Sequence, residues 1–304
     1  MMVAMTTADI CRNDAILDQW HPIAVENEVR PDVVAETTLL GCRVSYSAAG
    51  GGDPVAWRSV PAIRAGGSFD ASLVNEPLPL LLQYGYVWSS LGQPPAQLFE
   101  LPEYAEPDRR NIHAATIGVA CSAPRAVENF LDMGHFPFVH AGILGIEPHT
   151  EVREYEVDVD DKNEIWATEC VFYQPVAAMT SEGGQMSNYI FRVPHPYCVL
   201  LYKSCPLDPT RMDVIGLFVR SVTADHIEAS MFLSVIDVES TDSEIKRFQQ
   251  TIFAQDKPIL ENQHPKLLPL DPRFETPIRA DHVAITYRRW LSELGVTYGV
   301  IPAA

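Results

Sequence analysis

Apolar and polar positions alternate with a period of two along residues 150–159 and 164–173, and four further β-rich segments follow in the second half of the chain. Alternation of this kind is typical of strands that bury one face, and polar turns separate each segment from the next. The pattern therefore predicts a meander of antiparallel strands. The expected strands cover residues 150–159, 164–173, 188–193, 197–204, 212–222 and 228–238.

Helical spacing appears before and after this β region. Residues 122–133 begin with Ser122, a typical N-cap, and carry Pro124 in the first turn. Residues 243–263 and 280–294 repeat apolar side chains every three or four positions, which predicts two further helices. One large antiparallel sheet with flanking helices is an α+β fold.

The first third of the chain has a different pattern. Residues 43–47 and 84–88 are short β-rich runs, and 47–54 is expected to form a hairpin tip. Residues 1–16 have the pattern of a loose tail, and 102–113 that of a connector with two prolines and a charge cluster. We therefore expect two domains, a β domain over 1–110 and a second domain over 111–304.

Composition narrows the functional classes. Of 304 residues, 47% are hydrophobic, which is enough for a sizeable core. The formal charge of −18 disfavours nucleic-acid binding, because phosphate contacts need clustered Lys and Arg. No apolar run is long enough to span a membrane, and the N-terminus lacks the basic start of a signal peptide, so we expect a cytoplasmic protein.

The cysteines add one exclusion. None belongs to a Cys-x-x-Cys pair, and none is followed by His two or three residues later, which argues against a structural zinc or an iron–sulfur cluster held by this chain. Scattered reduced thiols are the expectation. The six are Cys11, Cys42, Cys121, Cys170, Cys198 and Cys205.

The segment ENFLDMGHFPFVHAGILG holds the densest candidate chemistry. Asn129, Asp132 and His135 are spaced at i, i+3 and i+6, which would put them on one helix face. Pro137 interrupts the helical pattern, and such a kink would let His140 converge on His135. The alternative is two ordinary histidines at a helix end, bonded to backbone, and spacing alone does not exclude it.

A carboxylate far along the chain is the candidate third ligand. Asp256 falls on the apolar stripe of the 243–263 helix, which runs through Ile245, Phe248, Ile252 and Ile259. A carboxylate that faces a core is costly unless it is paired or binds a metal. A salt bridge to a buried Arg or Lys, or a helix bend ahead of Pro258, would also account for it.

Two His and one carboxylate form the facial triad of non-haem Fe(II) enzymes, which leaves positions open for dioxygen and substrate. Zinc hydrolases also use this ligand set, but they usually carry a helical His-Glu-x-x-His with its general-base Glu. The chain has no such motif. Iron is therefore the better prediction.

These residues resemble the catalytic-domain signature of Rieske-type non-haem iron oxygenase α subunits. The signature is an Asn followed by Asp-x-x-His-x-x-x-x-His, and QDKPILENQ is similar to the carboxylate-ligand helix of the demethylase branch. WHPIAVENEVRP (20–31) and YGYVWSSLGQP (84–94) resemble the flanks of the family's Rieske domain. The resemblance implies a helix-grip, START-like catalytic domain and a truncated Rieske-like β domain.

One departure from the family is informative. The family holds its [2Fe–2S] cluster with Cys-x-His and Cys-x-x-His pairs, whereas here only Cys42 lies in that interval, followed by Arg43 and Val44. We therefore expect a cluster-less domain and a cluster supplied by another polypeptide, a Rieske-bearing reductase fed by NAD(P)H or a partner subunit. In this respect the chain resembles cluster-less catalytic subunits of bacterial methylxanthine N7-demethylases in caffeine degradation. That likeness implies dioxygen-dependent N-demethylation with release of formaldehyde.

The resemblance also implies residue roles and partners. His135, His140 and Asp256 would hold Fe(II), Asp132 would receive the electron-transfer contact and orient a histidine, and Asn129 would lie near the iron. A trimer-based oligomer with a further accessory structural subunit is expected. Candidate substrate-pocket residues are Phe136, Phe138, Phe248, Gln249, Ile252 and Phe253.

Two other classes of function compete with this one. The chain could be an oxygenase for another aromatic substrate, acting by O-demethylation or ring hydroxylation. It could also be a non-catalytic structural or ligand-binding subunit that kept the fold. The intact His/His/Asp set argues against the second, because a subunit that had lost its activity would have no physical reason to keep a buried Asp on an apolar stripe.

Overall fold

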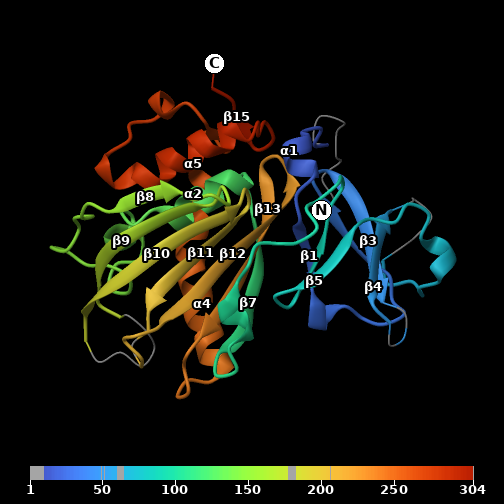
Figure 1. The fold of residues 1–304 in the computed structure, drawn as a ribbon, viewed down its shortest axis with the longest axis horizontal. Coiled ribbons are helices and arrows are strands. Elements are labelled where there is room, and N and C mark those ends of the chain that lie inside the picture. The colour runs from blue at the N-terminus through green and yellow to red at the C-terminus, as the bar shows by residue number, and fades with distance from the viewer. Residues whose placement is uncertain are drawn as a thin grey trace.

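The computed structural model describes residues 10–48, 50, 52–59, 65–176, 183–205 and 207–303. It contains a large sheet flanked by helices and, beside it, a smaller β unit formed by the N-terminal third of the chain (Figure 1). This arrangement confirms the predicted α+β layout.

The large sheet has seven antiparallel strands in the order β7-β13-β12-β11-β10-β9-β8. Each of the six predicted segments contributes a strand, although the first is shorter than expected and starts only at Glu156. The predicted connector at 102–113 is corrected in part, because its last residues begin β7, which pairs with β13. The strands are β7 (Arg110–Val119), β8 (Glu156–Val159), β9 (Ile165–Gln174), β10 (Gln185–His195), β11 (Cys198–Ser204), β12 (Met212–Thr223) and β13 (His226–Val235).

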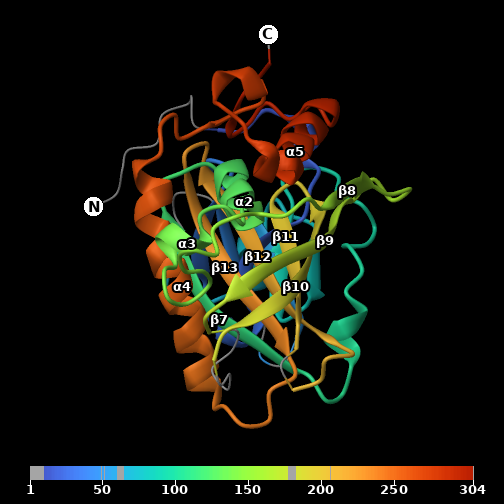
Figure 2. The same ribbon diagram turned by 90° about the vertical axis from the view of Figure 1, so that its left-hand side faces the viewer.

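Both faces of the sheet are covered. Leu201, Leu217 and Met231 line a pocket on the side of the helices, whereas their neighbours Leu200 and Phe218 pack against aromatic rings of the N-terminal unit. Figure 2 shows α2 and α4 in front of the sheet and the N-terminal unit behind it. Successive side chains of a strand point to opposite faces, which explains why β11 is apolar nearly throughout.

The helices begin where the capping signals place them. The Ser122 hydroxyl accepts a hydrogen bond from the Arg125 amide at the start of α2, and Thr241 and Glu244 form a capping box at the start of α4. The α-helices are α1 (Asp14–Leu17), α2 (Ala123–Leu131), α3 (Phe136–Val139), α4 (Asp242–Asn262) and α5 (His282–Glu293). The 3₁₀ turns are η1 (Glu26–Glu28), η2 (Ala71–Leu73), η3 (Pro102–Ala105), η4 (Pro272–Phe274) and η5 (Arg279–Asp281).

The N-terminal unit consists of two three-stranded antiparallel sheets, β1-β6-β5 and β2-β3-β4. The hairpin tip expected at 47–54 joins β3 to β4, with residues 49 and 51 outside the described residues. Tyr84 and Gly85 have positive φ and form the turn before β6, so the strand begins two residues later than predicted. The strands are β1 (His21–Val25), β2 (Ala35–Leu39), β3 (Cys42–Ala48), β4 (Pro54–Arg58), β5 (Leu80–Gln83) and β6 (Tyr86–Ser89).

The chain ends pack onto the same body. Cys11 and Ile16 are buried, so the predicted loose tail is wrong for residues 10–16, whereas 1–9 lie outside the described residues. Near the C-terminus, β14 (Leu268–Pro269) pairs in parallel with β15 (Val300–Ile301). Within the described ranges, no helix combines the length and the apolar character needed to cross a membrane.

Candidate metal centre

The chain turns sharply between α2 and α3, and this turn delivers the two histidines. Helix α2 ends at Leu131 and Asp132 is its C-cap, so Asn129, Asp132 and His135 do not share one continuous helix face. The Asp132 carboxylate accepts a hydrogen bond from the Gly134 amide at 2.7 Å and thereby competes with helix continuation. Pro137 lies in the first turn of α3, so the helix break precedes the proline that the sequence suggested as its cause.

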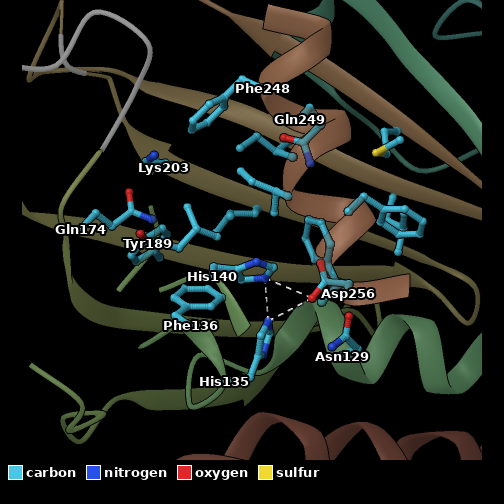
Figure 3. Close-up of a pocket in the computed structure, with 18 residues that line it drawn as sticks. Asn129, His135, Phe136, His140, Gln174, Tyr189, Lys203, Phe248, Gln249 and Asp256 are labelled. Carbon is cyan, nitrogen blue, oxygen red and sulfur yellow. Dashed lines mark hydrogen bonds and ion pairs between the residues drawn. The ribbon is translucent and has the colours of Figure 1, made fainter. Parts of the chain in front are cut away.

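Helix α4 supplies the third member of the site. Asp256 Oδ1 lies 3.3 Å from His135 Nε2 and 3.1 Å from His140 Nε2, and the two Nε2 atoms are 3.1 Å apart (Figure 3). In the described part of the chain, these three residues are the one group of His, Cys, Asp and Glu side chains close enough to share a metal ion. The sequence-predicted triad is therefore assembled in the structure.

Hydrogen bonds to Nδ1 of the two histidines fix the tautomer and the orientation of each imidazole ring. His135 Nδ1 lies 2.9 Å from Asp132 Oδ2, a carboxylate oxygen that can only accept, so Nδ1 carries a proton. His140 Nδ1 lies 2.9 Å from the amide oxygen of Gln255 and is protonated for the same reason. In the neutral form that binds a metal, each ring would therefore direct the lone pair of Nε2 toward the centre of the triangle.

The arrangement fits a bound cation. Two imidazole nitrogens and a buried carboxylate oxygen converge on one point, at 3.1 to 3.3 Å from one another. Three adjacent ligands of an octahedral ion with bonds of about 2.1 Å would lie roughly 3 Å apart, as these atoms do. The residues therefore fit the facial triad of a non-haem iron centre.

Electrostatics in the site agree with a cation-binding role. Burial opposes a charge on His135, but the carboxylates of Asp132 and Asp256 outweigh it and raise the pKa of His135 to about 9. Burial likewise opposes a charge on Asp256, yet hydrogen bonds and charge from His135 and His140 lower the pKa of Asp256. Two carboxylates thus favour positive charge at this point, whether a proton or a metal ion carries it.

The buried stripe of α4 is offset by one position from three residues of the predicted stripe, Phe248, Ile252 and Ile259. The buried positions are Ile245, Gln249, Phe253, Asp256 and Leu260, whereas Ile259 is exposed and its placement on the stripe is wrong. Pro258 lies inside the helix, which continues to Asn262, so it does not end α4 just after the ligand. Asp256 nevertheless faces the core, as predicted.

A pocket opens from the triad between α4 and the sheet (Figure 3). Asn129 and five of the six predicted pocket residues line it, and only Phe138 does not. Phe138 is 66% exposed, so its assignment as a pocket wall is corrected. The predicted residues that line the pocket are Asn129, Phe136, Phe248, Gln249, Ile252 and Phe253.

Several polar residues of the site were not found from the sequence. Gln255 orients His140, and Gln174, Tyr189 and Lys203 project from the sheet into the pocket. Gln255 immediately precedes the carboxylate ligand, so its position was a usable signal. The other three lie on three different strands, and only the strand register brings them together.

A second, polar hollow lies on the other side of His135. Asn129, Asp132 and His135 line it together with Asp281 and Arg288. The Asp132 side chain is 32% exposed, so it can be reached from the surface through this hollow. His135 thus stands between the apolar pocket and the polar hollow.

The fold and this ligand set are typical of mononuclear non-haem iron oxygenases. Comparison with known proteins narrows the class. The sequence profile of the vanillate O-demethylase oxygenase C-terminal domain matches residues 119–297. The chain therefore belongs to the vanillate O-demethylase oxygenase family, the demethylase branch of the Rieske-type non-haem iron oxygenases, and is an oxidative demethylase.

Two curated relatives carry more specific names. The chain is 41% identical to Probable methylxanthine N7-demethylase NdmC of Pseudomonas sp. (strain TJI-51), over 94% of this chain and 97% of that protein. It is 29% identical to methylxanthine N1-demethylase NdmA of Pseudomonas putida, over 70% of this chain and 59% of that protein.

Solved structures show the same fold. NdmA of Pseudomonas putida CBB5 superposes with a TM-score of 0.74 at 19% identity, covering 92% of this chain and 91% of that one. Dicamba monooxygenase bound to dicamba superposes with a TM-score of 0.70 at 16% identity, covering 92% and 97%. The likeness includes the N-terminal unit, because the profile-matched region alone would cover far less of the chain.

Proposed function

We propose that this chain is the catalytic subunit of a methylxanthine demethylase that removes the N7-methyl group as formaldehyde. Overall, the methyl carbon is hydroxylated and the N–CH₃ group becomes N–H plus formaldehyde. One dioxygen is consumed, two electrons come from NAD(P)H, and one water forms. The observation that carries the proposal is the Asp256–His135–His140 triangle at the head of an apolar pocket, in a chain 41% identical to NdmC.

His135, His140 and Asp256 would hold Fe(II), which supplies the activation of dioxygen when it is bound. Asp132 and Gln255 keep the protons of the two imidazoles on Nδ1, so that both Nε2 atoms remain available as ligands. The apolar pocket walls exclude water from the methyl group under attack. These residues position and shield the reaction.

Electrons would reach the site from outside the chain. No Cys-x-His or Cys-x-x-His pair is present in the sequence, so we propose a separate Rieske-bearing reductase or partner subunit as donor. The hollow that exposes Asp132 supports this side of the site as the point of contact, because Asp132 is bonded directly to His135. We also propose the division into a β domain over 1–110 and a catalytic domain over 111–304, and a trimer-based assembly in the cytoplasm.

The test reconstitutes the chain anaerobically with Fe(II), adds a Rieske-bearing reductase and NADH, and follows formaldehyde. The substrate panel contains methylxanthines that differ in the methylated nitrogen and aromatic methyl ethers. The proposal predicts formaldehyde from 7-methylxanthine with the Rieske-bearing reductase and none with a plain flavin reductase. Turnover of aromatic methyl ethers alone would overturn the substrate assignment.

Metal analysis of variants tests the ligands independently of turnover. His135→Ala and Asp256→Ala should each abolish iron binding while the far-ultraviolet circular dichroism spectrum is retained. Full iron content in Asp256→Ala would exclude Asp256 as a ligand. A wild-type chain that takes up no iron under anaerobic loading would instead favour the non-catalytic class of function.

A further inference from the structure

The pocket floor ends in a polar pair on neighbouring strands. Tyr189 of β10 and Lys203 of β11 are directly opposite each other in the antiparallel register, so their side chains share the face that lines the pocket. Both are buried, with 1% and 7% of their surface exposed. Figure 3 shows them across the pocket from Asp256.

The hydroxyl of Tyr189 is a buried polar group that a ligand would satisfy. Its ring lies in the pocket wall, and the Ser187 side chain is near enough to lower its pKa, yet no described residue meets the hydroxyl with the geometry of a hydrogen bond. A buried hydroxyl without a partner is costly, and such groups often mark a binding site. Next to it, the Lys203 ammonium can only donate hydrogen bonds. A ligand that meets both groups therefore needs an acceptor.

The charges around Lys203 indicate whether the acceptor group of the ligand is neutral or anionic. Asp213 of β12 lies opposite Lys203 on its other side, and its carboxylate accepts a hydrogen bond from the Ile236 amide at 2.7 Å. Burial lowers the pKa of Lys203 to about 8, while the charge of Asp213 opposes this shift and favours the ammonium form. Because Asp213 already balances this charge, an uncharged carbonyl oxygen fits better than a second carboxylate, which Asp213 would repel.

The opposite wall completes a pocket for a flat heterocycle. Gln249 of α4 is buried and points into the pocket, seven residues before Asp256 (Figure 3). At about 1.5 Å per residue, the two side chains are separated by roughly 10 Å along the helix. A fused bicyclic ring that presents its methyl group to the triad would therefore extend along α4 toward the Gln249 amide, inside the pocket that Tyr189 and Lys203 also line.

We propose that Tyr189 and Lys203 bind an oxo group of the substrate and thereby select uncharged dioxopurines over aromatic carboxylates. This inference rests on the proposed demethylase function and names the specificity-determining residues of the same pocket. No hydrogen bond, ion pair or ring contact among the described residues joins Tyr189 or Lys203 to the triad, so we expect both to act on binding of the ring.

Isothermal titration calorimetry on the anaerobic Fe(II)-loaded chain tests this without electron transfer. The probes are 7-methylxanthine, 7-methylpurine, which lacks both oxo groups, and 4-methoxybenzoate, which is an anion. Lys203→Met and Tyr189→Phe should each weaken 7-methylxanthine about tenfold and leave 7-methylpurine within about twofold. Wild-type protein should bind 7-methylxanthine more tightly than 4-methoxybenzoate.

Lys246→Met, which changes a lysine of α4 outside the pocket, is the matched control and should bind 7-methylxanthine like the wild type. In turnover assays, Lys203→Met and Tyr189→Phe should each raise KM and leave kcat nearly unchanged, as expected when an interaction stabilises the bound substrate and the transition state equally. Tyr189→Phe removes a single oxygen and carries the test if Lys203→Met fails to fold.

Equal weakening of 7-methylxanthine and 7-methylpurine would overturn the inference, because the residues would then only shape the pocket. Unchanged binding of 7-methylxanthine in both variants would also overturn it, and would leave the demethylase function standing if formaldehyde is still produced. A wild-type chain that binds only 4-methoxybenzoate would overturn the substrate assignment itself. These three results are distinguishable.

Discussion

The amide oxygen of Gln255 lies 2.9 Å from Nδ1 of His140, so the residue next to Asp256 orients a second member of the proposed metal site. Helix α4 thus contributes twice to the site, through Asp256 and through its neighbour. Loss of such a supporting contact typically lowers metal affinity by about 10- to 100-fold. We expect Gln255→Leu to show an iron affinity reduced by about this factor, measured by competition with a chelator.

The control for this prediction is Gln250→Leu on the same helix. The Gln250 amide donates to the Ala114 carbonyl of β7 and does not touch the triad. It should therefore lower stability without lowering iron affinity. If the two variants lose iron equally, general loosening of α4 would explain the effect and the orienting role of Gln255 would be wrong.

Asp132→Asn separates electron delivery from metal binding. An Asn side chain still offers one oxygen to His135 Nδ1, so iron should be retained, whereas the negative charge in the polar hollow is lost. We expect turnover with the Rieske-bearing reductase to fall by about 10- to 100-fold. Asp281→Asn changes another acid of the same hollow and should retain turnover. Undiminished turnover in Asp132→Asn would contradict an electron-transfer contact at this residue.

Gly145 is required by the tight loop that follows α3. A Cβ atom placed on Gly145 would lie 2.6 Å from the Pro137 nitrogen and 2.8 Å from its Cα, a clash with backbone that must shift. Gly145→Ala should therefore displace α3 and His140, cost about 1–3 kcal/mol of unfolding free energy and reduce iron content.

Gly118→Ala is the matched control, because the nearest atom to its added Cβ is 4.0 Å away. Chemical denaturation and metal analysis on both variants check the prediction. Full iron content in Gly145→Ala would show that the loop adjusts without moving His140.

Two buried histidines predict an acid-sensitive fold. His21 and His195 meet edge to face at 6.0 Å between the N-terminal unit and the sheet, and burial lowers the pKa of His21 to about 4. Below pH 6.5, His21 therefore binds a proton in the unfolded chain but remains neutral in the folded protein. The unfolding free energy should fall between pH 6.5 and 4, by about 3 kcal/mol from His21 alone.

Denaturation curves at several pH values test this against His21→Asn, which cannot titrate. The variant should be less stable at pH 7 but should lose less stability on acidification than the wild type. Parallel pH dependence in the two proteins would show that other groups cause the acid sensitivity. Arg220 also contributes, since its charge further disfavours protonation of His21.

The sequence predicted the three residues that converge in the structure, because each of them stands out in its local pattern. His135 and His140 are five residues apart, and Asp256 is a carboxylate on an apolar helix face. Tyr189 and Lys203 could not be found in this way, since each is an ordinary residue of a strand. The two residues lie side by side in the pocket only because their strands pair in this register, and no local sequence pattern predicts that register.

The helix break shows a second limit. Proline suggested a kink at residue 137, but a side chain–backbone hydrogen bond from Gly134 to Asp132 ends α2 earlier. Strand β7 was not predicted from the sequence for a different reason. Small and charged residues weaken its alternation of apolar and polar positions, and a proline-rich segment precedes it. A local hydrogen bond therefore sets the end of α2, and pairing with the distant strand β13 sets β7.

Because both faces of the large sheet are buried, removing the N-terminal unit would affect the solubility of the remaining fragment. A fragment starting at residue 111 would keep all three metal ligands, yet it would expose Leu200, Phe218 and Phe232 to water. These side chains form one continuous apolar surface, which would make the fragment prone to aggregation. Truncation to the metal-binding part would therefore yield insoluble protein, even though the N-terminal unit holds none of the metal ligands.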